Sequence, residues 1–398
     1  MKIRDKALAI IYFGTNIIGL PAPLLYSNFV SLFFINKILK KQYFKITLIF
    51  VFFLLAYFGI HYYFEIDMPT YLRSLALYVL VFINVIMAHC YIKHLGAKIS
   101  QVFEYIIKIN FLFFIVAILM LFLDIPNNLW RYYNYSDFGS PGGVPRFQGF
   151  LYEPSYYALI FSPVFLYAFY NLLFKERTIR ALNYFVLISI PMISTWSFGV
   201  LLGLVLAIVI AFTYYSLKYY KVNVYLLFAL TLIPVIAIFL LIFNSEISSR
   251  VALTLSGEDL SAKGRTSNAF EIAHYLATAK NALFGIGLGQ IKVFGQEYIQ
   301  NYYGYQKWYR VSIPNAFAET LVIFGYFGAF VRLLIQGIIF FKSKCYNNFF
   351  SLTLFIFIFI YQFTGSFITS TAEYIIWLLA VTNIFPAFNI SNNAKTSE

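Results

Sequence analysis

Long apolar segments alternate with short polar ones along the whole chain. A membrane-spanning helix needs about 20 predominantly apolar residues, and ten segments are clear candidates: 46–60, 74–92, 109–123, 150–174, 181–197, 198–217, 224–243, 316–340, 349–367 and 371–388. The stretch 7–36 is either one long helix kinked at Pro21 and Pro23 or two short spans that meet there. The pattern predicts an all-α polytopic membrane protein with about 12, alternatively 11, transmembrane helices.

Composition supports this class. The chain is 61% hydrophobic and 11% charged, whereas an ordinary soluble domain is about 45–50% apolar and about 25% charged. A basic flank and an apolar run open the sequence without an A-x-A-type cleavage site, which predicts membrane spans rather than a removed signal peptide. We therefore expect residues 1–398 to form one integral membrane domain.

The placement of Lys and Arg predicts the orientation. With two initial spans, 18 of these residues fall on the cytoplasmic side and 10 outside, 7 of the latter in one long loop where the positive-inside rule barely applies. Both termini and loop 93–108 are then cytoplasmic; a single first span would move only the N-terminus outside. The net charge of +13 thus follows the topology and does not predict nucleic-acid binding.

Two outer loops are long enough to carry function. Loop 124–149 is rich in Pro, Gly and aromatic residues, and loop 244–315 is the longest. The second loop contains a predicted helix at 266–281, with Ser267 or Asn268 as its N-cap and an acidic residue early in its first turn. Both loops are expected on the outer side of the membrane.

Several kinds of site are not expected. The two cysteines, Cys90 and Cys345, lie at predicted cytoplasmic positions, so no disulfide framework is predicted. The four histidines are scattered without zinc-binding spacing. The segment FGIGLGQ at 284–290 matches neither a P-loop nor G-x-G-x-x-G. We expect no cofactor and no metal, although Glu258 and Asp259 leave a metal ligand set open.

The segment RFQGFLYEPSYYALIF at 146–161 is the first candidate site. Glu153 and Pro154 are typical of a helix start, with Pro at the first helical position, and Arg146 is typical of an interfacial anchor. Together, an Arg and a carboxylate at the outer membrane surface also suit an anionic lipid head group. Gly149 is expected to break the segment, so that Arg146 folds back over the helix start.

The long loop and the following span hold further candidates. Arg265 precedes a helix N-terminus, a favourable place for a phosphate, although it is also explained as an exposed surface Arg. Asn315 and Glu319 share one helix face, and Glu319 at the membrane edge is either functional or paired with an outer-loop Arg. Arg332 and Gln336 lie deeper, where Arg332 alternatively snorkels.

Aromatic residues follow the loop helix. They suit stacking on sugar rings, although an aromatic belt at the membrane surface is the favoured explanation: Tyr302, Tyr303, Tyr305, Trp308 and Tyr309.

These motifs, taken in order, resemble the O-antigen polymerase and ligase superfamily over nearly the whole chain. The resemblance rests on R-x-x-G-F-x-x-E-P-S from Arg146 to Ser155, on Gly264–Arg265, on LFGIGLG at 283–289, and on Asn315 followed by Gly325 and Gly328. The opening LPAPLLYSNFVSLFF resembles the N-terminal hairpin of that group and favours two initial spans. Ligases of the family place a His before the Asn, where this chain has Pro314, and relatives often carry S-R-G where this chain has Phe198. The missing His favours a polymerase.

The resemblance implies a bacterial inner-membrane glycosyltransferase that uses undecaprenyl-pyrophosphate-linked oligosaccharides as donor and acceptor on the periplasmic face. The implied site residues are Arg146 and Arg265 for the pyrophosphate, Glu153 and then Glu319 as the base, and Asn315, His274, Trp308 and Arg310 for further substrate contacts. The implied partners are the lipid bilayer and a chain-length regulator in the membrane.

An O-antigen ligase and a lipid-linked glycan flippase or transporter are the alternatives. A transporter is expected to have broken helices in two related halves and charges near the membrane midplane. Here the predicted charges gather at the outer surface and one loop dominates, which favours an enzyme. A receptor or scaffold is the least favoured class.

Overall fold

The protein is described by a computed structural model. The structure describes residues 41–125, 128–131, 145–151, 153–175, 178–219, 256, 260–304 and 311–390. The candidate spans at 7–36 and 224–243 and both chain ends lie outside these residues, so the predicted total of about 12 spans and the placement of the termini stay predictions.

The described part is mostly helical. Five helical segments in this part are long and apolar enough to cross a membrane: α3 (Lys41–Tyr63), the run Met68–Phe122 formed by α4 (Met68–Leu95) and α5 (Ile99–Phe122), α6 (Pro154–Tyr170), α8 (Phe198–Tyr219) and α14 (Ala316–Ser343). Shorter apolar helices are α7 (Ile179–Ile193), α15 (Phe349–Tyr361) and α16 (Thr371–Val381). Each predicted span on described residues is therefore a helix, but α15 and α16 end several residues earlier than predicted.

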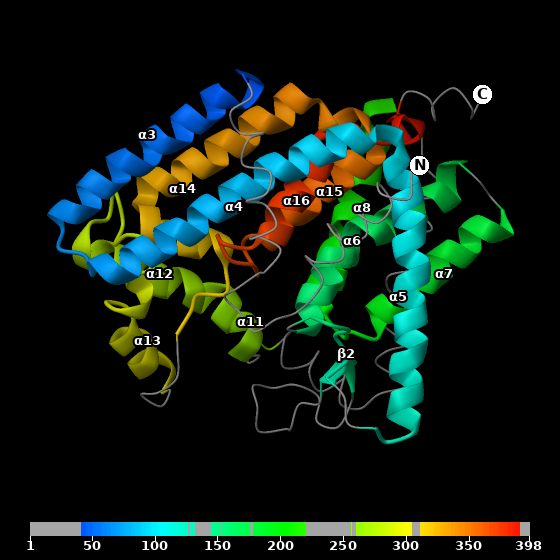
Figure 1. Ribbon diagram of the computed structural model, residues 1–398, viewed down its shortest axis with the longest axis horizontal. Coiled ribbons are helices and arrows are strands. Elements are labelled where there is room, and N and C mark those ends of the chain that lie inside the picture. Colours follow the sequence, from blue (N-terminus) through cyan, green and yellow to red (C-terminus); the bar gives the residue numbers. More distant parts are fainter. Residues whose placement is uncertain are drawn as a thin grey trace.

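Two large hydrophobic cores and a small one between α3 and α4 hold the described helices together. One large core joins α5, α6, α7 and α8 with α15 and α16; the other large core joins α3, α4 and α14 with the helices of the long loop. In Figure 1, α3, α4 and α14 run in similar directions, while α5 runs at a steep angle to α4 after the short turn Gly96–Lys98. α15 packs against both α8 and α16.

The elements formed by the loops 124–149 and 244–315 lie toward the lower side of Figure 1. They are α11 (Leu260–Arg265), α12 (Ser267–Lys280), α13 (Gln296–Tyr303) and a hairpin of two short antiparallel strands, β1 (Trp130–Arg131) and β2 (Arg146–Phe147). The hairpin was not part of the all-α prediction, because two-residue strands leave no periodic pattern.

The predicted loop helix is confirmed as α12, but its start differs from the prediction. The N-cap is Thr266, one residue before Ser267, and it makes no side-chain cap hydrogen bond. Glu271 lies beyond the first turn, which contains no acidic residue. The local N-cap signal was overridden because α11 runs almost directly into α12.

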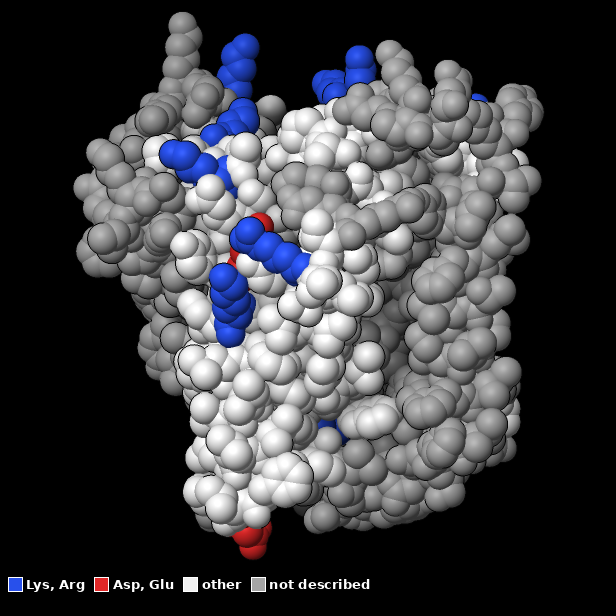
Figure 2. All heavy atoms as spheres, turned by 90° about the vertical axis from the view of Figure 1, so that its right-hand side faces the viewer, with Lys and Arg blue, Asp and Glu red and all other residues white. Residues whose placement is uncertain are grey.

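Basic side chains gather toward the upper end of the face shown in Figure 2, while an acidic side chain lies at its lower end. Near the beginning of α7, Arg180 forms an ion pair of 3.1 Å with Glu104 of α5, and Lys108 lies over the Tyr184 ring. This is the kind of asymmetry from which the orientation is predicted.

Candidate functional site

Helix α14 is broken at Gly325, and a segment of the long loop fills the break. Gly325 has φ 67° inside the helix. The freed backbone groups pair with the loop: Ile286 N donates to Val322 O (2.9 Å), Gly287 N to Ile323 O (3.1 Å), Tyr326 N to Ala282 O (3.0 Å) and Phe327 N to Leu283 O (3.0 Å). A break in an apolar helix is tolerated when other protein groups satisfy its backbone, and here the loop does so.

The glycine motif of the long loop and that of α14 are in direct backbone contact. Gly285 has φ 78°, and a Cβ there would lie 2.5 Å from Val322 O. A Cβ on Gly325 would lie 2.3 Å from Leu283 O. The LFGIGLG segment and the G-x-x-G of α14 are thus the two sides of one close backbone contact.

Side chains from α3 and the turn after it hold the loop in place. His61 is fully buried; its Nε2 donates to Phe284 O at 2.9 Å, and its Nδ1 lies 3.3 Å from the Tyr71 hydroxyl. Lys280, at the end of α12, donates to the carbonyls of Phe64 and Glu65 at 2.9 and 2.8 Å. Burial lowers the pKa of the Lys280 ammonium below its usual value. The long loop is therefore docked on the membrane helices.

Asn315 joins three segments at the start of α14. Its side chain is fully buried and caps the helix by accepting from Ala318 N at 2.8 Å. Its amide donates to Arg265 O at 2.8 Å and to Phe363 O at 2.6 Å. The predicted substrate-binding residue Asn315 thus has its amide group occupied by the protein itself, where it fixes Arg265 next to the turn after α15.

Glu319 lies one turn further along the same face of α14, as predicted. Its carboxylate is half-buried and accepts from the backbone N–H of Ile368 at 2.7 Å. The turn between α15 and α16 is therefore tied to α14 twice, through Asn315 and through Glu319.

Glu153 begins α6, with Pro154 at the first helical position, as predicted. Its side chain makes no cap hydrogen bond to the helix backbone and instead accepts from the Ser155 hydroxyl. Glu153 and Arg265 are both half-buried, and the charge of each reaches Tyr361 at the end of α15. The hydrogen bonds of the Asn315 amide to Arg265 O and Phe363 O hold the Arg265 backbone at this end of α15.

Arg146 lies in a different environment. Its guanidinium is 8% exposed and donates to Thr195 O at 2.9 Å and to Trp196 O at 3.3 Å, just after the end of α7. Gly149, with φ 57°, does break the segment as predicted. However, these hydrogen bonds direct Arg146 to the end of α7, whereas the sequence predicted it over the start of α6.

The remaining candidates are dispersed. His274 is exposed on α12, where its Nδ1 lies 2.6 Å from the Tyr326 hydroxyl beside the break in α14. Tyr302 donates to Glu271 at 2.7 Å, and this hydrogen bond raises the pKa of Tyr302 to about 12. Trp308 and Arg310 lie outside the described residues, as do Glu258 and Asp259.

A buried ion pair was missed by the sequence analysis. Arg332 of α14 and Glu373 of α16 lie 2.5 Å apart, and the Glu373 side chain is fully buried. Arg332 also donates to Gln362 at 2.8 Å and to the Thr320 hydroxyl at 2.9 Å. Arg332 therefore does not snorkel to the membrane surface. The sequence feature that could have predicted this pair is Glu373, the only acidic residue in the predicted span 371–388, since an acidic group within a membrane usually has a partner.

No protein-family model matches the chain, and no curated protein matches it. The described part of the chain is mostly helical, and five of its segments are able to cross a membrane.

Proposed function

We propose that this protein is a bacterial inner-membrane glycosyltransferase that polymerises undecaprenyl-pyrophosphate-linked repeat units of O-antigen, or of another surface polysaccharide, on the periplasmic face. The observation that carries the proposal is the Asn315 amide, which bonds the backbone of Arg265 and of Phe363 and so holds Arg265 at the end of α15, where its charge and that of Glu153 both reach Tyr361. Glu153 and Arg265 belong to distant segments of the chain. A carboxylate and a guanidinium suit the transfer of a glycan from a pyrophosphate leaving group, because the carboxylate can accept a proton and the guanidinium can stabilise the phosphate charge.

Arg265 and Glu153 have different roles in the proposed reaction. A hydroxyl of the acceptor sugar attacks the anomeric carbon of the donor glycan, and the bond from that carbon to the pyrophosphate oxygen breaks. The electron pair leaves with the lipid pyrophosphate, whose charge the Arg265 guanidinium stabilises. The hydroxyl proton passes to the carboxylate of Glu153. Glu319 is the second candidate for that proton.

Arg265 is the first choice for the pyrophosphate contact. The Arg146 guanidinium already donates to two backbone carbonyls at the end of α7, so binding the pyrophosphate there would require it to share or exchange these hydrogen bonds. Because these two hydrogen bonds hold the segment between α7 and α8, Arg146 has a structural role.

A lipid-linked glycan transporter is the second candidate function. The broken helix α14 and the buried Arg332–Glu373 pair are features of transporters. In transporters, however, the backbone groups freed by a broken helix bind the substrate or the coupling ion, whereas here those groups are paired with the loop 282–287. The enzyme is therefore favoured.

Deletion of the gene separates these functions. A polymerase deletion leaves surface polysaccharide with a single repeat unit. A ligase deletion leaves polymer on the lipid carrier, and a transporter deletion leaves single lipid-linked units on the cytoplasmic side. Complementation with Glu153→Gln is expected to restore the protein but not the polymer, and Glu271→Gln, an exposed acid in the same outer region, serves as the matched control. Full-length polymer in the deletion strain would overturn the proposal.

A further inference from the structure

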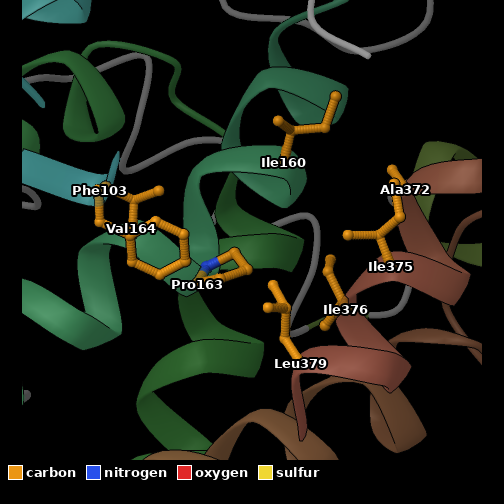
Figure 3. A pocket seen from close by; sticks show the side chains of 8 residues that line it. All are labelled: Phe103, Ile160, Pro163, Val164, Ala372, Ile375, Ile376 and Leu379. Atoms are coloured by element: carbon orange, nitrogen blue, oxygen red, sulfur yellow. The ribbon is translucent and has the colours of Figure 1, made fainter. Parts of the chain in front are cut away.

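A small cavity lies where α5, α6 and α16 meet, and it is not a candidate binding site. Its volume is about 40 Å³, and only apolar side chains line it, among them Phe103, Pro163 and Ile376. Figure 3 shows these side chains pointing toward one another across the void. An apolar void of this size has no group to hold a polar ligand or an ordered water.

A much larger cavity lies between α3, α4, α14 and α16. Its volume is about 720 Å³, and its walls are mainly apolar and aromatic, including Phe50, Phe82 and Trp377. Ile335 and Ile339, which line it, are 49% and 38% exposed. The cavity is therefore reached from the apolar outer surface of the helices, where bilayer lipid is expected, rather than from water.

The length of the cavity limits what it can hold. On the unbroken helix α4 the lining extends from Tyr78 to Lys93, which at 1.5 Å per residue is about 22 Å along the helix. The hydrocarbon core of a bilayer is about 30 Å thick, so an acyl chain of a phospholipid reaches through about half of it. A chain that fills this cavity must be longer than one leaflet.

The polar groups in the cavity wall do not contradict a hydrocarbon ligand. The Arg332 guanidinium is neutralised by Glu373 and hydrogen-bonded to Gln362 and Thr320. The side chain of Gln336 exchanges hydrogen bonds of 2.8 and 3.0 Å with that of Gln362. These groups therefore lose little when a hydrocarbon chain covers them.

One end of the cavity adjoins the candidate site. Thr320 and Ile368 line this end. Thr320 directly follows Glu319, and the N–H of Ile368 binds the Glu319 carboxylate at 2.7 Å. A chain in the cavity can therefore place its head group beside the residues at the start of α14, while its tail extends toward His89 and Lys93 at the other end.

We infer that this cavity binds the polyprenyl chain of the lipid-linked substrate, with its phosphate end at the start of α14, where Asn315 holds Arg265, and its tail between α3, α4 and α14. A polyprenyl chain is apolar, as the walls require, and is longer than one leaflet, as the cavity requires. The inference rests on the proposed function for the identity of the lipid, but its test needs no glycan transfer.

The test uses undecaprenyl phosphate that carries a diazirine on its last isoprene unit. The full-length protein in lipid nanodiscs is irradiated with this probe, and the labelled peptides are mapped by mass spectrometry. Label is expected near Ile339, Val381 and Ile49, which line the end distant from Glu319. Label spread over the lipid-facing surface, or a phospholipid with a diazirine at its acyl end labelling the same residues equally well, would overturn the inference.

Variants that fill the cavity give a second measurement. Val331→Trp and Val85→Trp place an indole in the cavity, and each is expected to lower labelling at least tenfold. Leu334→Trp is the matched control, because Leu334 is 49% exposed on the same helix and is not among the lining residues. Labelling of the cavity without any polymerisation would reject the proposed function alone. Polymerisation with labelling outside the cavity would reject the cavity alone.

Discussion

Gly285 and Gly325 lie back to back where the long loop enters helix α14. A Cβ on Gly285 would come within 2.6 Å of Gly325 N, and both residues have positive φ. The backbone contact that results lets α14 change direction inside an apolar region without leaving its N–H and C=O groups unpaired. It also fixes the position of α12 relative to the start of α14.

Gly285→Ala and Gly325→Ala are each expected to destabilise the protein by about 2–5 kcal/mol, because each adds left-handed strain to an overpacked contact. Gly337→Ala is the matched control: Gly337 lies in the same helix, and a Cβ there meets nothing within 4 Å. The control should be neutral or stabilising by about 0.5–1 kcal/mol. Thermal unfolding in detergent measures the difference, and equal stabilities for all three variants would contradict the contact.

The Arg332–Glu373 pair should show strong coupling. Removing one partner from a buried pair costs about 3–5 kcal/mol, whereas replacing both with apolar residues is often neutral. We therefore expect Arg332→Met or Glu373→Leu alone to destabilise strongly and the double variant to recover most of the loss. The exposed pair Arg180–Glu104 is the control, with an expected coupling of about 0–1 kcal/mol. A double variant as unstable as the sum of the single ones would refute this role.

Asp67 gives a pH-dependent prediction at the start of α4. Hydrogen bonds from Thr70 lower the pKa of this carboxyl below its usual 3.8. A lowered pKa means that the stabilisation is fully present above pH 3.8 and is lost as the pH falls through the lower, folded-state value. Asp67→Ala should therefore increase amide hydrogen exchange at Thr70 at neutral pH and make little difference in strong acid. Asp67→Asn, which caps without a charge, should be insensitive to pH over this range.

The apolar pattern was sufficient to predict the helices, because a chain with this composition has few other ways to bury its surface. It did not predict where α15 and α16 end. Residues 362–370 after α15 form turns that pack on α14 through Asn315 and Glu319, and α16 ends at Val381, before the turn Pro386–Phe388. Hydropathy does not distinguish a buried turn from the end of a helix.

Contacts between distant segments were beyond the sequence. The hydrogen bond from His61 to Phe284 O joins residues 223 positions apart in the sequence, and no local sequence pattern predicts it. Arg146 and Arg265 looked equivalent in sequence, since each is an arginine in an outer loop. The structure separates them, because Arg146 is buried against backbone carbonyls, whereas Arg265 is half-buried and its backbone is held next to Phe363 by Asn315.

The two arginines should therefore respond differently to substitution. Arg146→Ala removes two hydrogen bonds from a charged donor, each worth about 1.5–3 kcal/mol, and is expected to lower thermal stability and protein level. Arg265→Ala keeps the backbone carbonyl that binds Asn315, so the protein should fold normally and lose polymer. Arg265→Lys should restore polymer only in part, since an ammonium cannot form the bidentate contact. Normal polymer with Arg265→Ala would remove Arg265 from the site.

Glu153 provides the sharpest test of the proposed chemistry. Its side chain does not cap α6, so Glu153→Gln should cost little stability, while an amide cannot accept the proton of the acceptor hydroxyl. We expect purified Glu153→Gln to bind undecaprenyl-pyrophosphate-linked repeat units like the wild type and to join them at least a hundredfold more slowly. Ser155→Ala is the companion variant: it removes the hydroxyl that donates to Glu153 and should shift the pH dependence of the rate without abolishing it. If Glu153→Gln polymerises at the wild-type rate, Glu153 is not the base, and Glu319→Gln is the next variant to measure.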